Sequence, residues 1–102
     1  MLELRPNCEC CDKDLPPAST EARICSYECT FCAACVDNVL FNVCPNCGGG
    51  FVPRPIRPAR ERRPGASLTQ HPASDKRRHL KYDRASIAAF VDALRALSPE
   101  RR

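Results

Sequence analysis

Eight cysteines in four close pairs constrain this 102-residue chain more than any other feature of its sequence. The pairs are Cys8/Cys11, Cys25/Cys29, Cys32/Cys35 and Cys44/Cys47, and a ninth cysteine, Cys10, lies inside the first pair. A segment of about 50 residues buries too little apolar surface to offset its conformational entropy, and domains of this size usually need disulfides, metals or oligomerisation. We therefore expect the cysteines to cross-link a small domain in the first half of the chain.

Metal ligation and disulfide bonding are the two explanations for these cysteines. The chain begins Met-Leu-Glu-Leu-Arg-Pro, which lacks the apolar run of a signal peptide, and no apolar segment of about 18 residues occurs. We therefore expect a cytoplasmic protein with no membrane partner, in which thiols stay reduced and Cys-x-x-Cys spacing is typical of metal ligands. A disulfide framework stays the alternative, although the odd number of cysteines disfavours complete pairing.

The paired spacing predicts two metal sites. Zinc prefers four tetrahedral ligands, and one Cys-x-x-Cys turn brings two sulfurs to one ion, so two turns close one site. Two, thirteen, three, two, two, eight and two residues separate successive paired cysteines. We expect two Zn²⁺ ions, although the sequence does not distinguish zinc from iron. The predicted ligands are Cys8, Cys11, Cys25, Cys29, Cys32, Cys35, Cys44 and Cys47.

This order of spacings resembles the RING-finger pattern, with Cys29 at a position where many RING domains have histidine. The resemblance implies a small metal-stabilised α+β fold with a RING-like, treble-clef cross-brace. Its first site would take Cys8, Cys11, Cys32 and Cys35, and its second Cys25, Cys29, Cys44 and Cys47. Two points stay open: a ribbon-like site could instead group Cys29, Cys32, Cys44 and Cys47, and Cys10 is either a spare thiol or a replacement for Cys8.

The RING resemblance does not extend to ubiquitin-ligase activity. RING ligases contact a conjugating enzyme through apolar residues near the first ligands and in the short helix, frequently a tryptophan, and often through a basic residue after the last pair. Here Glu9 and Cys10 lie inside the first pair, Gly48 follows Cys47, and the chain has no tryptophan; only Pro45 fits. Because four thiolates per metal also leave no coordination position for water, we expect a non-catalytic protein.

A second resemblance covers roughly residues 1–58. The segments Leu-Arg-Pro-Asn-Cys-Glu-Cys-Cys-Asp-Lys-Asp-Leu-Pro-Pro, Ile-Cys-Ser-Tyr-Glu-Cys-Thr-Phe-Cys and Cys-Pro-Asn-Cys-Gly-Gly, with the later Arg-Pro-Ile-Arg-Pro, resemble a small cysteine-rich bacterial family known as domain of unknown function 1272. The resemblance implies a compact metal-binding protein and supplies no activity. The chain after about residue 59 lies outside it.

Composition and periodicity divide the chain into three parts: a cysteine-rich domain at 1–52, a Pro/Arg-rich linker at 53–81 and an amphipathic helix at 82–98. In the first part we expect short strands at 22–26 and 51–52, one to two helical turns within 36–43, and a positive φ at Gly48. Prolines and arginines interrupt all periodicity in the linker, which predicts an extended or disordered segment. Asp83 can cap a helix of about 14 residues, whose apolar stripe is Ile87, Phe90, Val91, Leu94 and Leu97.

Charged residues, like the cysteines, are distributed unevenly between the two halves of the chain. Residues 1–50 contain three basic and seven acidic residues, whereas residues 51–102 contain thirteen basic and five acidic residues. The basic tail can therefore fold onto its own head or reach an acidic partner. The helix needs a cover for its apolar stripe, which its own head, a second copy in a homodimer or another protein can provide.

Three functions fit these features. The first is an interaction or adaptor module whose zinc ions are structural and whose partner is another protein. The second is nucleic-acid binding through the arginines of 54–63 and the basic residues of 76–84, although few aromatic residues are interleaved for base stacking. The third is a redox switch in which oxidation of a thiolate pair, with Cys10 as a possible trigger, expels zinc.

Overall fold

A three-stranded antiparallel sheet and a short helical segment form the centre of the head, which we define as residues 1–52. The computed structural model describes all residues, 1–102, as an α+β fold. The sheet contains β1 (Ala22–Ile24), β2 (Thr30–Cys32) and β3 (Val52–Pro53) in the order β2-β1-β3. Ala22 pairs with Cys32 and Ile24 with Val52. The strands expected at 22–26 and 51–52 are therefore present, while β2 was not predicted.

The helical segment follows β2 directly. Helix α1 (Ala33–Cys35) continues into the π-helical turn η1 (Val36–Leu40), which agrees with the expected one to two turns. Phe41 and Asn42 end the segment with φ angles of 47° and 61°, in the left-handed region. The Asn42 side chain then accepts a 2.9 Å hydrogen bond from the backbone N–H of Phe51. This bond fixes the return of the chain from the last cysteine pair to β3.

Cysteines make up a large part of the core. The main buried cluster has 14 residues, among them six of the cysteines, and its largest side chain is Phe31, which is fully buried. The Phe31 ring packs edge-on against Phe51, with 5.4 Å between centroids and 73° between planes. Because so much of the core consists of thiols, its stability depends on the chemical state of the sulfurs.

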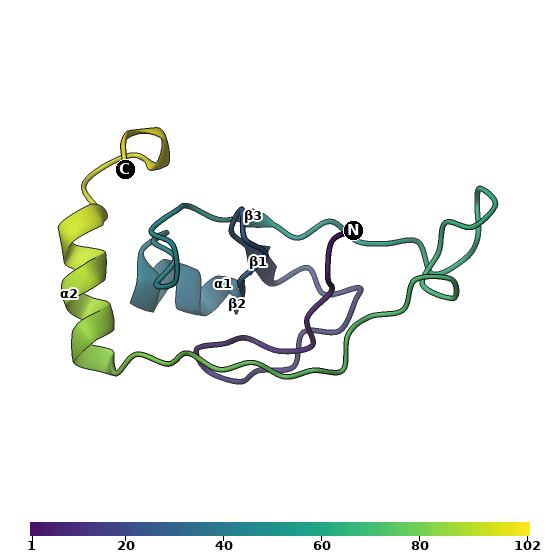
Figure 1. The fold of residues 1–102 in the computed structure, drawn as a ribbon, viewed down its shortest axis with the longest axis horizontal. Helices are drawn as coiled ribbons and strands as arrows, with labels where there is room; N and C mark the ends of the chain where they lie inside the picture. The colour runs from purple at the N-terminus through teal and green to yellow at the C-terminus, as the bar shows by residue number, and fades with distance from the viewer.

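Residues 54–82 are irregular, as the proline content predicts, but the parts of this segment that flank the loop 58–72 lie against the head. In Figure 1 the green segment that leads to α2 runs alongside the purple N-terminal arm. We call residues 74–82 the strap. Its backbone N–H groups at Ser74 and Leu80 donate to the carbonyls of Leu4 and Glu9, each at 3.0 Å. The preceding loop, 58–72, projects from the opposite end of the molecule to α2.

Helix α2 (Arg84–Leu94) stands at one end of the head (Figure 1). Asp83 caps it as predicted, accepting a 2.7 Å hydrogen bond from the Ser86 N–H. The helix has 11 residues rather than about 14, and the chain then turns through 95–98 into the 3₁₀ helix η2 (Pro99–Arg101). Ile87 and Val91 are buried in the core cluster. The head of the same chain thus covers part of the apolar stripe of α2. None of the helices has the length and apolar character needed to span a membrane.

Candidate metal centres

The first cluster brings together the first and third cysteine pairs. The sulfurs of Cys8, Cys11, Cys32 and Cys35 all lie within 4.8 Å of one another. The Cys11 and Cys32 sulfurs are 3.7 Å apart. Three of these cysteines are buried and Cys11 is exposed. A turn of the N-terminal arm supplies the first pair. The third pair comes from the end of β2, which supplies Cys32, and from helix α1, which supplies Cys35.

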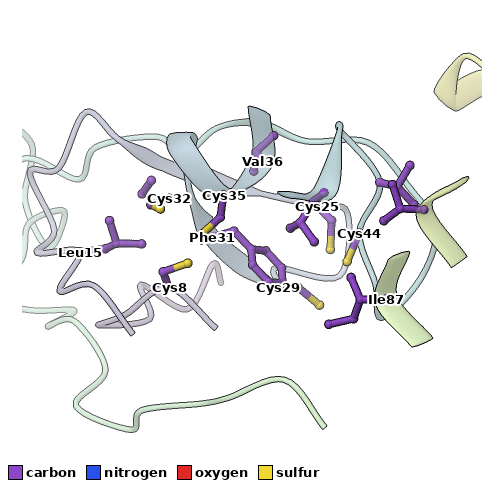
Figure 2. Close-up of a cluster of buried hydrophobic side chains, with 14 residues drawn as sticks. Cys8, Leu15, Cys25, Cys29, Phe31, Cys32, Cys35, Val36, Cys44 and Ile87 are labelled. Atoms are coloured by element: carbon purple, nitrogen blue, oxygen red, sulfur yellow. The ribbon is translucent and has the colours of Figure 1, made fainter. Parts of the chain in front are cut away.

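The second cluster joins cysteines of the second and fourth pairs. The sulfurs of Cys25, Cys44 and Cys47 all lie within 4.8 Å of one another. The remaining predicted ligand, Cys29, is not part of this group of three, but the Cys25 N–H donates to the Cys29 carbonyl at 3.2 Å. In Figure 2 the ring of Phe31 lies between the sulfurs of Cys25, Cys29 and Cys44 and those of Cys8, Cys32 and Cys35. The head therefore has two separate cysteine clusters that could hold metal ions.

Backbone N–H groups point at the sulfurs of the second cluster. The Tyr27 N–H donates to the Cys25 sulfur at 3.3 Å, and the Gly49 N–H donates to the Cys47 sulfur at 3.4 Å. The predicted positive φ of Gly48, which is +80°, allows its N–H to close the turn on the Cys44 carbonyl at 2.7 Å. Such donors stabilise thiolates, which are the form that binds metals.

Crowding of the thiols changes their acidity. Burial raises the pKa of the Cys8 thiol to about 11, and burial together with the Cys32 sulfur raises the pKa of Cys35. In the second cluster, hydrogen bonds from Cys29 and Cys44 lower the pKa of the Cys25 thiol to about 3. Interaction with the Cys25 thiol, followed by interaction with the Cys29 thiol and by burial, raises the pKa of the Cys44 thiol. Several adjacent thiolates cannot form together without a compensating cation, so each cluster favours a bound metal ion.

The donor sets fit a thiophilic divalent ion. In a tetrahedral site with Zn–S bonds of about 2.3 Å, neighbouring sulfurs are about 3.8 Å apart. The Cys11–Cys32 distance of 3.7 Å agrees with this spacing. All nine cysteines are free thiols, so no disulfide takes a sulfur from either cluster.

The grouping also bears on the alternatives left open by the sequence. Cys32 lies with Cys8 and Cys35, so the ribbon-like combination of Cys29, Cys32, Cys44 and Cys47 is not formed. Cys8 lies in the first cluster, whereas Cys10 is half-buried, packs against the core and is outside both clusters. The first cluster thus joins the first and third pairs, and the second joins Cys25 to the fourth pair.

Sequence reasoning did not identify Glu9 as a structural residue of this region. Its side chain is 7% exposed, and it accepts hydrogen bonds from the Thr30 N–H at 2.9 Å and the Asn46 amide at 3.2 Å. It also pairs with Arg5 at 3.3 Å. Glu9 thus links the turn of the first cysteine pair to the turn of the fourth. No sequence signal separates it from a solvated acidic residue.

Comparison with known proteins places the chain in a family. The model of the family described as protein of unknown function (DUF1272) matches residues 1–57, which include every cysteine. The chain belongs to this family. An uncharacterised protein of Rhizobium meliloti (strain 1021) is 57% identical over 77 residues, which cover 76% of this chain and 84% of the relative. No solved structure matches the chain significantly.

The similarity to the Rhizobium protein is longer than the family region. Its 77 residues exceed the 57 matched by the DUF1272 model, so at least 20 of them lie in the second half of the chain. The family region contains both cysteine clusters, and the relative shares part of the sequence that follows them. The family match itself ends at residue 57, in agreement with the expectation that the chain after about residue 59 lies outside the family resemblance.

Proposed function

We propose that this DUF1272 protein is a non-catalytic interaction module whose head is held by two structural zinc ions in a RING-like cross-brace. One observation carries the proposal: the chain forms two cysteine clusters, one of four sulfurs within 4.8 Å and one of three with Cys29 beside it, and all of these cysteines except Cys11 and Cys47 belong to the core. Zinc fits sulfur donors, and four protein ligands close a site against water. Such sites stabilise folds without binding substrate.

Zinc ions in these sites would supply the cross-links that the small core needs. Cys8, Cys11, Cys32 and Cys35 would hold one ion, and Cys25, Cys29, Cys44 and Cys47 the other. Each ion would tie a cysteine turn to a segment distant in sequence, and structural zinc in small domains commonly contributes enough free energy to decide folding. The function then depends on the surfaces that the cross-linked head presents.

The arrangement of the tail favours a protein partner over the alternative of nucleic acid. Arg54 is 4% exposed and its guanidinium donates to the carbonyls of Arg5, Leu15 and Pro16 at 2.8–3.2 Å. Arg57 donates to the carbonyls of Leu2 and His71. These arginines bind the chain itself, which leaves fewer free cations to neutralise phosphates along an extended nucleic acid.

Native mass spectrometry of the purified chain tests the zinc sites. We expect two zinc ions per chain with nine reduced cysteines, and X-ray absorption should show four sulfur ligands at about 2.3 Å. Iron in the same sites would appear in the metal analysis and in the visible absorption spectrum. A metal-free chain with its cysteines joined in disulfides would overturn the proposal.

A further inference from the structure

The surface between the strap, α2 and the last cysteine turn contains a basic cleft that continues into an apolar groove. The groove has a volume of about 310 Å³ and is lined by Pro45, Asn46, Tyr82, Ser86, Ile87 and Phe90. The cleft, of about 540 Å³, shares Asn46 and Tyr82 with it. Both volumes are in the range of ligand-binding clefts, about 300–1,000 Å³.

We propose that this surface binds an acidic segment of a partner protein, with an apolar side chain in the groove and carboxylates in the cleft. This inference rests on the interaction function proposed above. Binding of such a segment requires free positive charge in the cleft and an open apolar surface beside it.

The cleft has positive charge that the chain does not neutralise. Four of its residues are basic at neutral pH: Arg5, Lys76, Arg78 and Lys81. Arg5 pairs with Glu3 and Glu9, and Arg78 pairs with Glu3. Lys76 and Lys81 are exposed and take part in no ion pair. The two lysines are therefore free to bind a carboxylate from another molecule.

The strap holds these lysines in place. The Asn7 amide donates to the Arg78 carbonyl at 2.8 Å and accepts from the Arg78 N–H at 3.2 Å, so one side chain fixes both polar groups of that residue. The Arg78 guanidinium keeps one buried donor, Nε, without an acceptor in the chain. Because the strap is held before binding, less conformational entropy is lost on association.

The groove next to the cleft leaves aromatic surface open. Tyr82 is 52% exposed and Phe90 is 40% exposed, although both lie where the strap and α2 meet the head. Aromatic residues of this kind often anchor protein interfaces. An apolar side chain with an acidic neighbour matches the combined surface in both polarity and charge.

The rest of the head disfavours a long polyanion. Asp12 and Asp14 bind Arg77, and Glu3 binds Arg78. The unpaired Lys76 and Lys81 share their short cleft with Glu9. The unpaired Arg62 and Arg63 lie apart from it, in the exposed loop 58–72 at the opposite end of the molecule to α2, whereas nucleic acids need an extended cationic track. A short peptide can enter the cleft without crossing the acidic surface.

One other explanation for the lysines must be separated from this proposal. Cys29 lines the same cleft, so Lys76 and Lys81 would also compensate the negative charge of a zinc-bound thiolate cluster. Under that explanation, reversing the lysine charges releases zinc. Under our proposal, zinc is retained and only peptide binding is lost.

The test is a selection from random peptides of about 12 residues, displayed on phage, against the zinc-loaded full chain. We expect enrichment of peptides that combine several Asp or Glu residues with an aromatic or large aliphatic residue. The best synthetic peptide should bind the double variant Lys76→Glu, Lys81→Glu at least about tenfold more weakly. Tyr82→Ser should weaken binding by about fivefold or more through the groove.

A matched pair of charge reversals provides the control. Arg62→Glu with Arg63→Glu makes the same change of net charge in the exposed loop 58–72 and should alter affinity by less than about twofold. The proposal is wrong if no acidic-apolar class is enriched, or if both charge reversals weaken binding equally. It is also wrong if a single-stranded DNA oligonucleotide binds more tightly with the same dependence on the lysines.

The zinc content of every sample separates this inference from the proposed function. A wild-type chain without zinc contradicts the proposed function. If the chain retains two zinc ions but no peptide class is enriched, peptide binding by the groove and cleft is contradicted and the proposed zinc sites are not. Loss of zinc from the Lys76→Glu, Lys81→Glu variant assigns the lysines to the thiolate cluster and overturns the peptide proposal.

Discussion

The head and the tail of this chain are stabilised by different chemistry. In the head, 1–52, the sulfurs of distant segments meet in two clusters, and only seven residues are in strands. In the tail, 53–102, arginine side chains bind backbone carbonyls of the head and α2 packs two buried residues against it. The head therefore depends on ligands within itself, whereas the tail depends on the head.

This difference predicts an order of events in unfolding. Disrupting a cysteine cluster should unfold the head and detach the tail from it, because the tail binds a surface that the clusters form. Disrupting the contacts of the tail should leave the head folded and metallated. The following changes test this asymmetry, from the largest expected effect to the smallest.

Replacement of a core cysteine should have the largest effect. Cys44→Ser removes a fully buried sulfur from the second cluster. We expect the zinc content to fall from two to one and cooperative unfolding to be lost, since structural zinc sites often decide whether small domains fold. Zinc analysis and thermal unfolding followed by circular dichroism would measure both. Cys10→Ser is the matched control and should keep two zinc ions; equal loss in both variants would contradict the ligand assignment.

Removal of the Arg54 guanidinium should destabilise the protein without removing zinc. Arg54→Met deletes three hydrogen bonds and leaves the carbonyls of Leu15 and Pro16 without this donor. We expect a loss of about 3 kcal/mol in the free energy of unfolding, because hydrogen bonds from charged groups are stronger than neutral ones. Chemical denaturation would measure it. Arg62→Met in the exposed loop is the control, and an equal loss there would contradict a stabilising role of the Arg54 hydrogen bonds.

Truncation in α2 should release the helix but not the head. Ile87 is 4% exposed and packs in the core cluster, so Ile87→Ala should weaken helix docking by about 2–3 kcal/mol. Hydrogen exchange should become faster in residues 84–94 and stay unchanged in β1 and β2. Asp92→Ala on the exposed face is the control. Faster exchange throughout the head would show that α2 supports the metal sites.

Loss of the helix cap should have the smallest effect. Hydrogen bonding from the Ser86 N–H lowers the pKa of the Asp83 carboxyl in the folded state. Its contribution is therefore complete above the ordinary aspartate pKa of about 3.9 and disappears as pH falls through the lowered value. Asp83→Ala should reduce protection of the first turn of α2 at pH 7, whereas Asp83→Asn, which can still accept the bond, should reduce it less. Equal protection in all three proteins would contradict the cap.

The sequence predicted the elements that depend on local signals. Asp83 marked the start of α2 because its carboxylate can bind the N–H groups of the first turn, and the positive φ of Gly48 followed from its place after the last cysteine. These two features need no knowledge of distant contacts. The grouping of the first and third cysteine pairs was instead implied by the resemblance to RING fingers, while the spacing alone left a ribbon-like grouping open.

Other features could not be predicted because they depend on distant partners. β2 was missed because only Thr30 and Phe31 separate Cys29 from Cys32, and this short segment forms a strand only through pairing with β1. Arg54 looked like part of a solvated linker, but its guanidinium is buried among carbonyls 38–49 residues away in sequence. A charged side chain gives the same local pattern whether it is solvated or buried.

Hydrogen exchange before and after metal removal tests the central claim most directly. A thiol-compatible chelator should remove both ions and abolish slow exchange in the β1–β2 ladder and, together with it, in α2, because the tail has no independent support. Restoring zinc should restore protection in both regions. Persistent protection of residues 22–32 in a fully reduced, metal-free chain would contradict the claim that metal-bound cysteine clusters hold the head and, through it, the tail.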